Sequence, residues 1–317
     1  MTFTEKYINP FTDFGFKKLF GTELNKALLI NFLNEVILPE QRKITDLTYK
    51  KNDHLGATEF DRKAIFDLYC VGENDERFIV EMQKAKQNYF KDRTLFYATF
   101  PIQEQAQKGD WDYQLSEIFT VGILDFVFTD DVENGEVRHE VLLKDQHCRV
   151  FYDKLTFIYL EMPNFTKTEA ELETTYDKWL FVLKNLSNLE NRPNKLQEKI
   201  FEQLFEAAEI ARFTPNEKQQ YEDSLKSYRD LKNVLDTSFE EGKMEGKMEG
   251  LLEGKMEGLL EGKMEGLLEG KMKGKMEGIV KALQQGKLSV EDIAEIFDET
   301  VKFVLEVKIQ NDGKSPQ

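Results

Sequence analysis

Glycine recurs at every fourth position from Gly242 to Gly278, in units that read EGKM or EGLL. Each glycine inside a helix costs about 1 kcal/mol relative to alanine. A four-residue period also exceeds the 3.6 residues of a helical turn, so the Met and Leu side chains drift around a straight helix. We therefore do not expect a stable helix from this segment alone. It either pairs with a partner or forms a semi-flexible spacer, and a tolerated repeat expansion is the alternative to a self-association role.

The rest of the chain has the composition of a globular protein. It is 317 residues long, with 40% hydrophobic and 32% charged residues. No apolar run reaches the length of a transmembrane helix, and the N-terminus has no apolar signal core. We therefore expect a cytoplasmic protein without a membrane partner. Cys70 and Cys148 lie in apolar runs, which predicts reduced, buried thiols, and neither they nor the three histidines have the spacing of a zinc site.

The net charge of -16 disfavours a generic nucleic-acid binder, because phosphate contacts normally require a basic face. A local basic patch is present at Lys84, Lys86, Lys91 and Arg93. It is either a solvated helix face or a contact for phosphate. An acidic protein can still cut DNA if such a patch and a bound metal supply the positive charge.

Hydrophobic periodicity predicts an α/β arrangement. Two short helices follow Pro10, where Thr12 or Asp13 caps the first, Gly21 ends it and Thr22 caps the second. The predicted strands are residues 44–50, 63–71, 77–83 and 118–128, with two more within 137–161. Residues 51–60 are predicted to form a polar loop. Residues 89–107 predict a helix that Pro101 kinks or interrupts, and 169–237 predict helices with breaks near Pro193 and Pro215.

After the repeat, residues 279–309 predict two or three short helices, with Ser289 as the cap of the middle one. This outline occurs in DNA-binding helix–turn–helix modules. The segment is acidic, which favours a packing or dimerisation hairpin instead.

One hairpin carries the residues that are suited to chemistry. Residues 72–76 form a turn between two β-prone runs, and alternation along the second run puts Glu81 and Gln83 on the same face. The first run holds Asp67 in otherwise apolar surroundings. Two carboxylates in such strands are costly to bury unless a hard cation with oxygen ligands compensates them. The alternative is that both side chains point to solvent from the exposed face of a sheet.

The residues around this hairpin resemble a known family. The chain reads NPFTDFGFKKLFG near its start, then DRKAIFDLYC, RFIVEMQ and EIFTVGILDF in that order. This combination is similar to the Rpn family of bacterial recombination-promoting nucleases and transposases, within the PD-(D/E)XK superfamily. The similarity is close over residues 7–130, and tails with glycine at every fourth position also occur in members of the family.

The resemblance implies roles for individual residues. Asp67 matches the metal-binding Asp of the superfamily, Glu81 matches its D/E position, and Gln83 stands where many members have the catalytic Lys. Asp13 and the backbone carbonyl of Met82 are the further metal ligands that it suggests. Arg93 and Tyr97 match an R-x-x-x-Y pattern on one helix face, which implies that they contact the scissile phosphate or pack under it. Together with Lys84 and Lys86 of the basic patch, they are the residues expected at DNA or phosphate. Lys86 is the expected substitute for the missing lysine charge, because Lys84 points to the opposite strand face.

The resemblance also implies a fold and a function. The fold expected is a restriction-endonuclease-like mixed sheet flanked by helices, with a C-terminal helical extension. The function expected is a Mg²⁺- or Mn²⁺-dependent DNA endonuclease that hydrolyses phosphodiesters and promotes recombination or is related to transposons. The alternative is a catalytically inactive nuclease fold that acts as an oligomerising interaction module. The expected organisation is a nuclease-like core at 1–165, a helical region at 166–240, the repeat at 241–278, through which the chain could form a homo-oligomer, and a small helical unit at 279–317.

Overall fold

The structure is a computed structural model that describes residues 5–37, 43–50, 53–54, 64–106, 112–127 and 135–312, with the backbone alone at 53–54, 64–65 and 312. The chain divides into two compact units, Met1–Asp236 and Thr237–Gln317. Most of the loop predicted at 51–60 lies outside the described residues, as do Lys63, residue 107 and residue 128 at the ends of three predicted elements.

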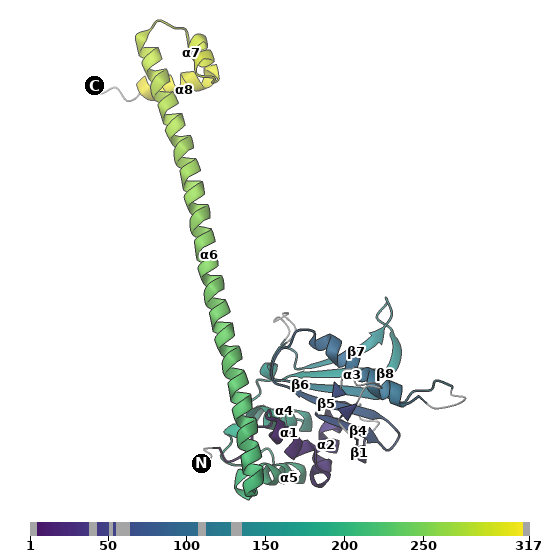
Figure 1. Cartoon of the computed structure of the whole chain (residues 1–317). Helices are drawn as coiled ribbons and strands as arrows, with labels where there is room; N and C mark the ends of the chain where they lie inside the picture. The colour runs from purple at the N-terminus through teal and green to yellow at the C-terminus, as the bar shows by residue number, and fades with distance from the viewer. Residues whose placement is uncertain are drawn as a thin grey trace. The chain divides into compact units, whose positions relative to one another are not determined.

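A six-stranded mixed sheet forms the centre of the first unit (Figure 1). Its order is β1 (Leu47–Tyr49), β4 (Leu68–Gly72), β5 (Arg77–Gln83), β6 (Ile118–Leu124), β8 (Val150–Glu161) and β7 (Arg138–Lys144). Strands β5, β6 and β8 are parallel, and the outer pairings are antiparallel. A separate two-stranded pair joins β2 (Asp53–His54) to β3 (Ala64–Ile65). The predicted α/β fold with a mixed sheet is confirmed.

Helices cover both faces of the sheet. One face packs against α1 (Asp13–Phe20), α2 (Lys26–Val36), α4 (Thr175–Asn185) and α5 (Lys199–Ala208), and the other against α3 (Phe90–Glu104) (Figure 1). Alternation along β6 explains the two layers, because Val121 and Ile123 enter the larger core while Ile118 and Leu124 pack with α3 residues. Short 3-10 turns connect these elements: η1 (Glu23–Asn25), η2 (Met162–Asn164), η3 (Glu169–Glu171), η4 (Leu186–Asn188) and η5 (Ile210–Arg212).

The local signals at the opening helices are confirmed. The Thr12 hydroxyl accepts a hydrogen bond from Gly15 N at 2.9 Å and caps α1. Gly21 ends this helix, and Thr22 caps η1, directly before α2. The break near Pro193 separates α4 from α5, and Pro215 is the first residue of α6.

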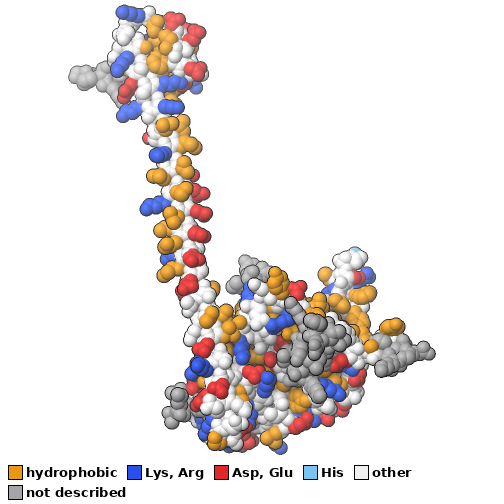
Figure 2. All heavy atoms as spheres, viewed as in Figure 1, with side chains coloured by type: hydrophobic (Ala, Val, Ile, Leu, Met, Phe, Trp, Pro, Cys, Tyr) orange, Lys and Arg blue, Asp and Glu red, His pale blue; other side chains and the backbone are white. Residues whose placement is uncertain are grey.

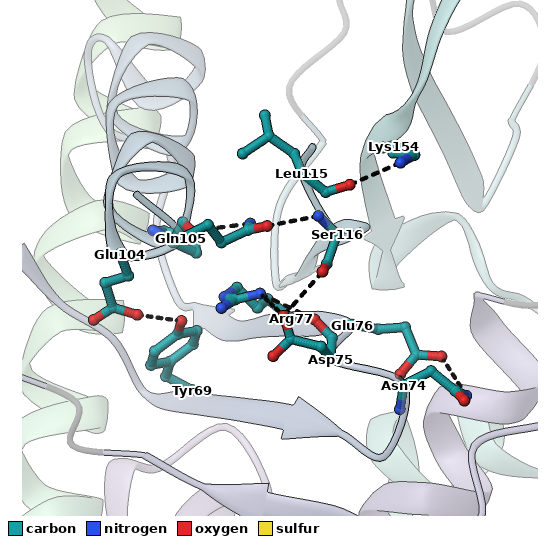
Figure 3. Close-up of polar contacts among 11 residues, drawn as sticks. Tyr69, Asn74, Asp75, Glu76, Arg77, Glu104, Gln105, Leu115, Ser116 and Lys154 are labelled. Atoms are coloured by element: carbon teal, nitrogen blue, oxygen red, sulfur yellow. Dashed lines mark hydrogen bonds and ion pairs between the residues drawn. The ribbon is translucent and has the colours of Figure 1, made fainter. Parts of the chain in front are cut away.

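A polar network at the start of β5 fixes the end of α3 against the sheet (Figure 3). The Tyr69 hydroxyl donates to Glu104 at 2.5 Å, and the Gln105 side chain accepts from Ser116 N at 2.6 Å. Asp75 accepts from both Arg77 and Ser116 at 2.9 Å. The network lies at the end of β5 opposite to Glu81 and Gln83, so it orients α3 without occupying the candidate site.

The second unit is helical. It comprises the later part of α6 (Pro215–Gln285), α7 (Val290–Ile296) and α8 (Val301–Asp312). Ser289 caps α7 through a capping box, as predicted. Its small core is formed by Ile279, Ile293, Ala294, Val304 and Val307. Among the described helices, none combines the length and the apolar character that a membrane span requires.

Three sequence expectations need correction. The strand expected at 63–71 is divided, because Phe66 and Asp67 interrupt it between β3 and β4. Pro101 does not interrupt α3, which continues to Glu104. Cys148 is exposed rather than buried, because it lies in the turn between β7 and β8 with a positive φ of 59°. Cys70 is buried, as expected.

Candidate active site

The candidate site lies where β5 ends, on the sheet face that α3 covers. Ile79, Glu81 and Gln83 alternate along β5 and therefore share one face. Ile79 packs there with Phe66 and Tyr69, against the α3 residues Tyr97 and Phe100. The hairpin that the sequence predicts is confirmed, with β4 and β5 antiparallel from Leu68 opposite Val80 onward.

Asp67 lies just before β4, and its carboxylate takes the place of a backbone carbonyl as the acceptor for an N–H of β5. Its Oδ2 accepts a hydrogen bond from Met82 N at 2.8 Å. Burial raises the pKa of Asp67 above its usual value, and the negative charge of Asp13 adds to the rise. The hydrogen bond from Met82 and the charges of Lys17 and Lys84 act in the opposite direction. Asp67 is thus a desolvated carboxylate at the end of a strand.

Glu81 is buried close to Asp67. Its side chain is 5% exposed, and burial raises its pKa to about 8, with the charge of Asp67 as the second cause. The positive charge of Arg93 and a hydrogen bond from Gln83 lower the pKa again, but do not offset the first two causes. Two mutually repelling, desolvated carboxylates are what a cation stabilises most.

Gln83 connects Glu81 to a positive charge on α3. Its Nε2 donates to Glu81 Oε2 at 2.7 Å, and its Oε1 accepts from Arg93 Nη2 at 2.5 Å. The carboxylate and the guanidinium fix opposite ends of the amide, so its orientation follows from both partners. Arg93 also donates to Gln87.

Aromatic side chains on α3 frame this arrangement. The Arg93 guanidinium lies 5.8 Å from the ring centroids of both Phe90 and Tyr97. Tyr97 contacts Phe66, with ring centroids 5.4 Å apart. Burial raises the pKa of the Tyr97 hydroxyl, and the negative charge of Glu81 adds to the rise. The R-x-x-x-Y pair therefore faces the two carboxylates.

The remaining candidates have more peripheral positions. Asp13 is close enough for its charge to act on Asp67, but it is largely exposed and pairs with Lys17 at 2.8 Å. Lys84 also acts on Asp67, whereas the Lys86 side chain is exposed. Lys17 was not singled out from the sequence. The Lys17–Asp13 spacing of four residues on the opening helix was the signal that could have found it.

Asp125 is a second residue that sequence reasoning missed. It follows β6 directly, its N–H donates to Gln83 O at 2.9 Å, and its carboxylate accepts from the Tyr228 hydroxyl of α6 at 2.9 Å. Burial raises the pKa of Asp125. Its place after a buried strand parallel to β5 was the available signal, since the carboxyl ends of parallel strands meet at one edge.

The chemistry of these donors fits a hard divalent cation. Among the described residues, no three His, Cys, Asp or Glu side chains form a group that would hold a metal ion. The buried carboxylates that could hold an ion here are those of Asp67 and Glu81. This pair suffices for Mg²⁺, which commonly takes one or two carboxylates and completes its shell with water and substrate phosphate.

Comparison with known proteins identifies the family. The family model described as PD-(D/E)XK nuclease family transposase matches residues 10–238, which is more than half of the chain. No curated protein and no solved structure matches the chain. Nucleases of this kind generally use divalent metals, in line with the donor set described above. The match includes the sheet, α3 and every candidate site residue, and it ends before the glycine repeat. The chain therefore belongs to the PD-(D/E)XK nuclease family transposases.

Proposed function

We propose that the protein is a metal-dependent DNA endonuclease that hydrolyses phosphodiester bonds in recombination or transposon-related DNA processing. The observation that carries the proposal is the buried Asp67–Glu81 pair, whose pKa values are both raised. A protein gains no stability from two uncompensated buried carboxylates, so their presence points to a bound cation.

In this proposal Asp67, Glu81 and the carbonyl of Met82 hold the ion, which is Mg²⁺ or Mn²⁺. The N–H and C=O of a strand residue face the same neighbouring strand, and the Met82 N–H donates to Asp67. The Met82 carbonyl is therefore the backbone oxygen expected on that side. Asp13, which is exposed and close to Asp67, contributes through its charge or through a bound water. A divalent ion held there would polarise the scissile phosphate and would lower the pKa of a bound water.

Gln83 replaces the lysine that many nucleases of this superfamily carry at this position. An amide orients a water or a phosphate oxygen but brings no charge. Arg93 compensates, because its positively charged guanidinium donates a hydrogen bond to the Gln83 side chain. We propose that Arg93 supplies the positive charge that stabilises the developing negative charge on phosphate, and that Tyr97 positions Arg93. Lys84 and Lys86 extend this contact along the DNA backbone.

The alternative is a nuclease fold without activity that serves as an interaction module. Gln83 in place of lysine and the net charge of -16 are the observations that favour it. Binding to DNA is in either case expected to be weak and strongly salt-dependent, because the protein repels phosphate at long range. Self-association through the 241–278 repeat is compatible with both functions.

Nicking of supercoiled plasmid by the full chain tests the proposal. We expect nicking with Mg²⁺ or Mn²⁺, none with EDTA, and none for Asp67→Asn or Glu81→Gln. Glu190→Gln, an exposed carboxylate on a loop after α4, is the matched control and keeps activity. Arg93→Lys retains part of the activity, whereas Arg93→Gln loses more than about tenfold, since one electrostatic contact of this kind is worth 1.4 kcal/mol or more. A wild-type protein that is folded and inactive with both metals would favour the interaction module.

A further inference from the structure

The repeat in α6 has four rows of residues, because each position of its four-residue unit recurs along the helix. The Met/Leu row comprises Met244, Met248, Leu252, Met256, Leu260, Met264, Leu268 and Met272. The Glu row comprises the acidic residues from Glu241 to Glu269, and the Lys/Leu row runs from Lys243 to Lys271, with leucine at 251, 259 and 267. The Gly row runs from Gly242 to Gly278.

The Met/Leu row is unpartnered in the single chain. Its members are 50–73% exposed, and the three leucines of the Lys/Leu row are exposed to a similar degree. A Cβ added at any glycine from Gly242 to Gly274 would meet no atom within 4 Å. Figure 2 shows the apolar side chains standing out from the helix, with acidic groups along one side and lysines along the other. So long an exposed apolar row is unfavourable in water, which indicates an interaction surface.

The charge pattern around this row identifies its partner. Successive residues of a helix are about 100° apart, so the Glu row lies about 60–100° to one side of the Met/Leu row and the Lys/Leu row about 60–100° to the other. When two identical helices pair in parallel about a two-fold axis, opposite flanks of the two copies meet. Glu residues of one copy then face Lys residues of the other. An antiparallel pair would place Glu against Glu and Lys against Lys.

We propose that the Met/Leu row of α6 pairs in parallel with the same row of a second copy of this chain. The period of four exceeds 3.6, so the row advances about 40° per repeat and winds around the helix in a right-handed sense. The two helices therefore wind around each other in a right-handed sense, which keeps the two rows in contact along the repeat. A parallel pair brings residue 241 of both copies to the same end.

The Gly row lies on the far side of each helix, about 160° from the Met/Leu row. Its glycines weaken the isolated helix, so the pairing contacts supply stability that the single helix lacks. The glycines are therefore not contact residues in this arrangement. This separates the proposal from one in which glycines allow the two backbones to approach each other.

The mass of the full chain in solution tests the pairing, by sedimentation equilibrium without metal or DNA. The expected result is twice the 37.1 kDa of one chain at micromolar concentration. The combined variant Leu252→Asn, Met256→Asn, Leu260→Asn is expected to sediment as a single chain. The matched control, Gly250→Ala, Gly254→Ala, Gly258→Ala, keeps the double mass or pairs more tightly. A single-chain mass for the wild type, a mass above two chains, or dissociation of the glycine control would overturn the proposal.

Disulfide cross-linking tests the orientation. In a Cys148→Ser background, which removes the exposed native thiol, Met244→Cys is expected to cross-link with itself under oxidation. Gly246→Cys, from the opposite row, is expected to remain uncross-linked. An antiparallel pair gives another result, in which Met244→Cys cross-links only when it is mixed with Met272→Cys. That outcome, or cross-linking through Gly246→Cys, would contradict the parallel Met/Leu pairing. Neither test depends on nuclease activity.

Discussion

Glycines have opposite environments in the two units of this protein. In the first unit, Met1–Asp236, called the nuclease unit after its family, a Cβ at Gly122 would lie 2.9 Å from the Tyr159 ring, and one at Gly21 would lie 2.8 Å from a backbone oxygen. In the repeat, nine successive glycines from Gly242 to Gly274 have open space at that position. The packing of the nuclease unit therefore depends on which residue occupies each position. The structure of the repeat depends on its four-residue period, and the identity of any single residue matters little.

The largest difference between the two units is expected in the stability lost when a large side chain is removed. Trp179 is fully buried against Phe20, Phe32 and Phe201, and its indole N–H donates to Asn31 at 2.7 Å. Trp179→Ala should destabilise the nuclease unit by about 3–5 kcal/mol. Met256→Ala should leave the unfolding of that unit unchanged. Scanning calorimetry of the full chain measures both, and equal effects would remove the distinction between the units.

The candidate site should be a weak point within the stable unit. The folded-state pKa of Glu81, about 8, lies above the 4.5 of an ordinary glutamate, so the folded chain holds this proton more tightly than the unfolded chain does. The stability contributed by this group is full below pH 4.5 and is lost as the pH rises toward 8. Glu81→Gln should therefore stabilise the metal-free protein at pH 8 by several kcal/mol, since each pKa unit corresponds to about 1.4 kcal/mol. Urea unfolding in EDTA at pH 5 and pH 8 checks this, and a variant destabilised at pH 8 would contradict it.

Adding one methyl group should have opposite effects in the two units. Gly122→Ala pushes against Tyr159, whose hydroxyl is hydrogen-bonded to Thr94, and should cost about 1–3 kcal/mol. Gly258→Ala should stabilise the repeat helix by about 1 kcal/mol. Thermal unfolding followed by circular dichroism measures both variants. Destabilisation by Gly258→Ala would mean that the repeat has close contacts, as the nuclease unit does.

The smallest effect concerns an ion pair that joins α1 to the start of α6. Lys18 donates to Glu217 at 2.5 Å, and this hydrogen bond is the main cause that lowers the pKa of Glu217 to about 2. Because the folded-state pKa is depressed, the stability is present above pH 4.5 and is lost as the pH falls toward 2. Glu217→Gln should cost about 0.5–1 kcal/mol at pH 7, since the pair is partly exposed. It should also flatten the stability profile between pH 4.5 and 2, which acid titration of unfolding measures.

Sequence patterns predicted the elements that depend on local chemistry. The strand at 77–83 has the predicted bounds. The caps at Thr12 and Ser289 are also present, and they were predictable because each depends on residues only three positions apart. The strand break at Asp67 was not predicted. The Asp67 side chain accepts the hydrogen bond of Met82 N in place of a backbone carbonyl, and hydrophobic periodicity does not reveal such a contact. The exposure of Cys148 was missed because an apolar run does not show where a hairpin turns.

The sequence indicated which residues belong to the candidate site, but not the hydrogen bonds that connect them. The resemblance indicated Asp67, Glu81, Gln83, Arg93 and Tyr97 individually. The contact from Gln83 to Arg93 depends on how α3 packs on the sheet, and the contact from Asp125 to Tyr228 spans 103 positions in the chain. Neither has a local pattern. The compensation of a missing lysine by an arginine on α3 could therefore be proposed only after the fold was known.

Titration of Mn²⁺ into the full chain, followed by electron paramagnetic resonance of the free ion, shows whether Asp67 and Glu81 bind a divalent cation. We expect one saturable Mn²⁺ site per chain, lost in both Asp67→Asn and Glu81→Gln and unchanged in Glu190→Gln. Mn²⁺ binding that is undiminished in both site variants would contradict this expectation, whatever activity the protein shows.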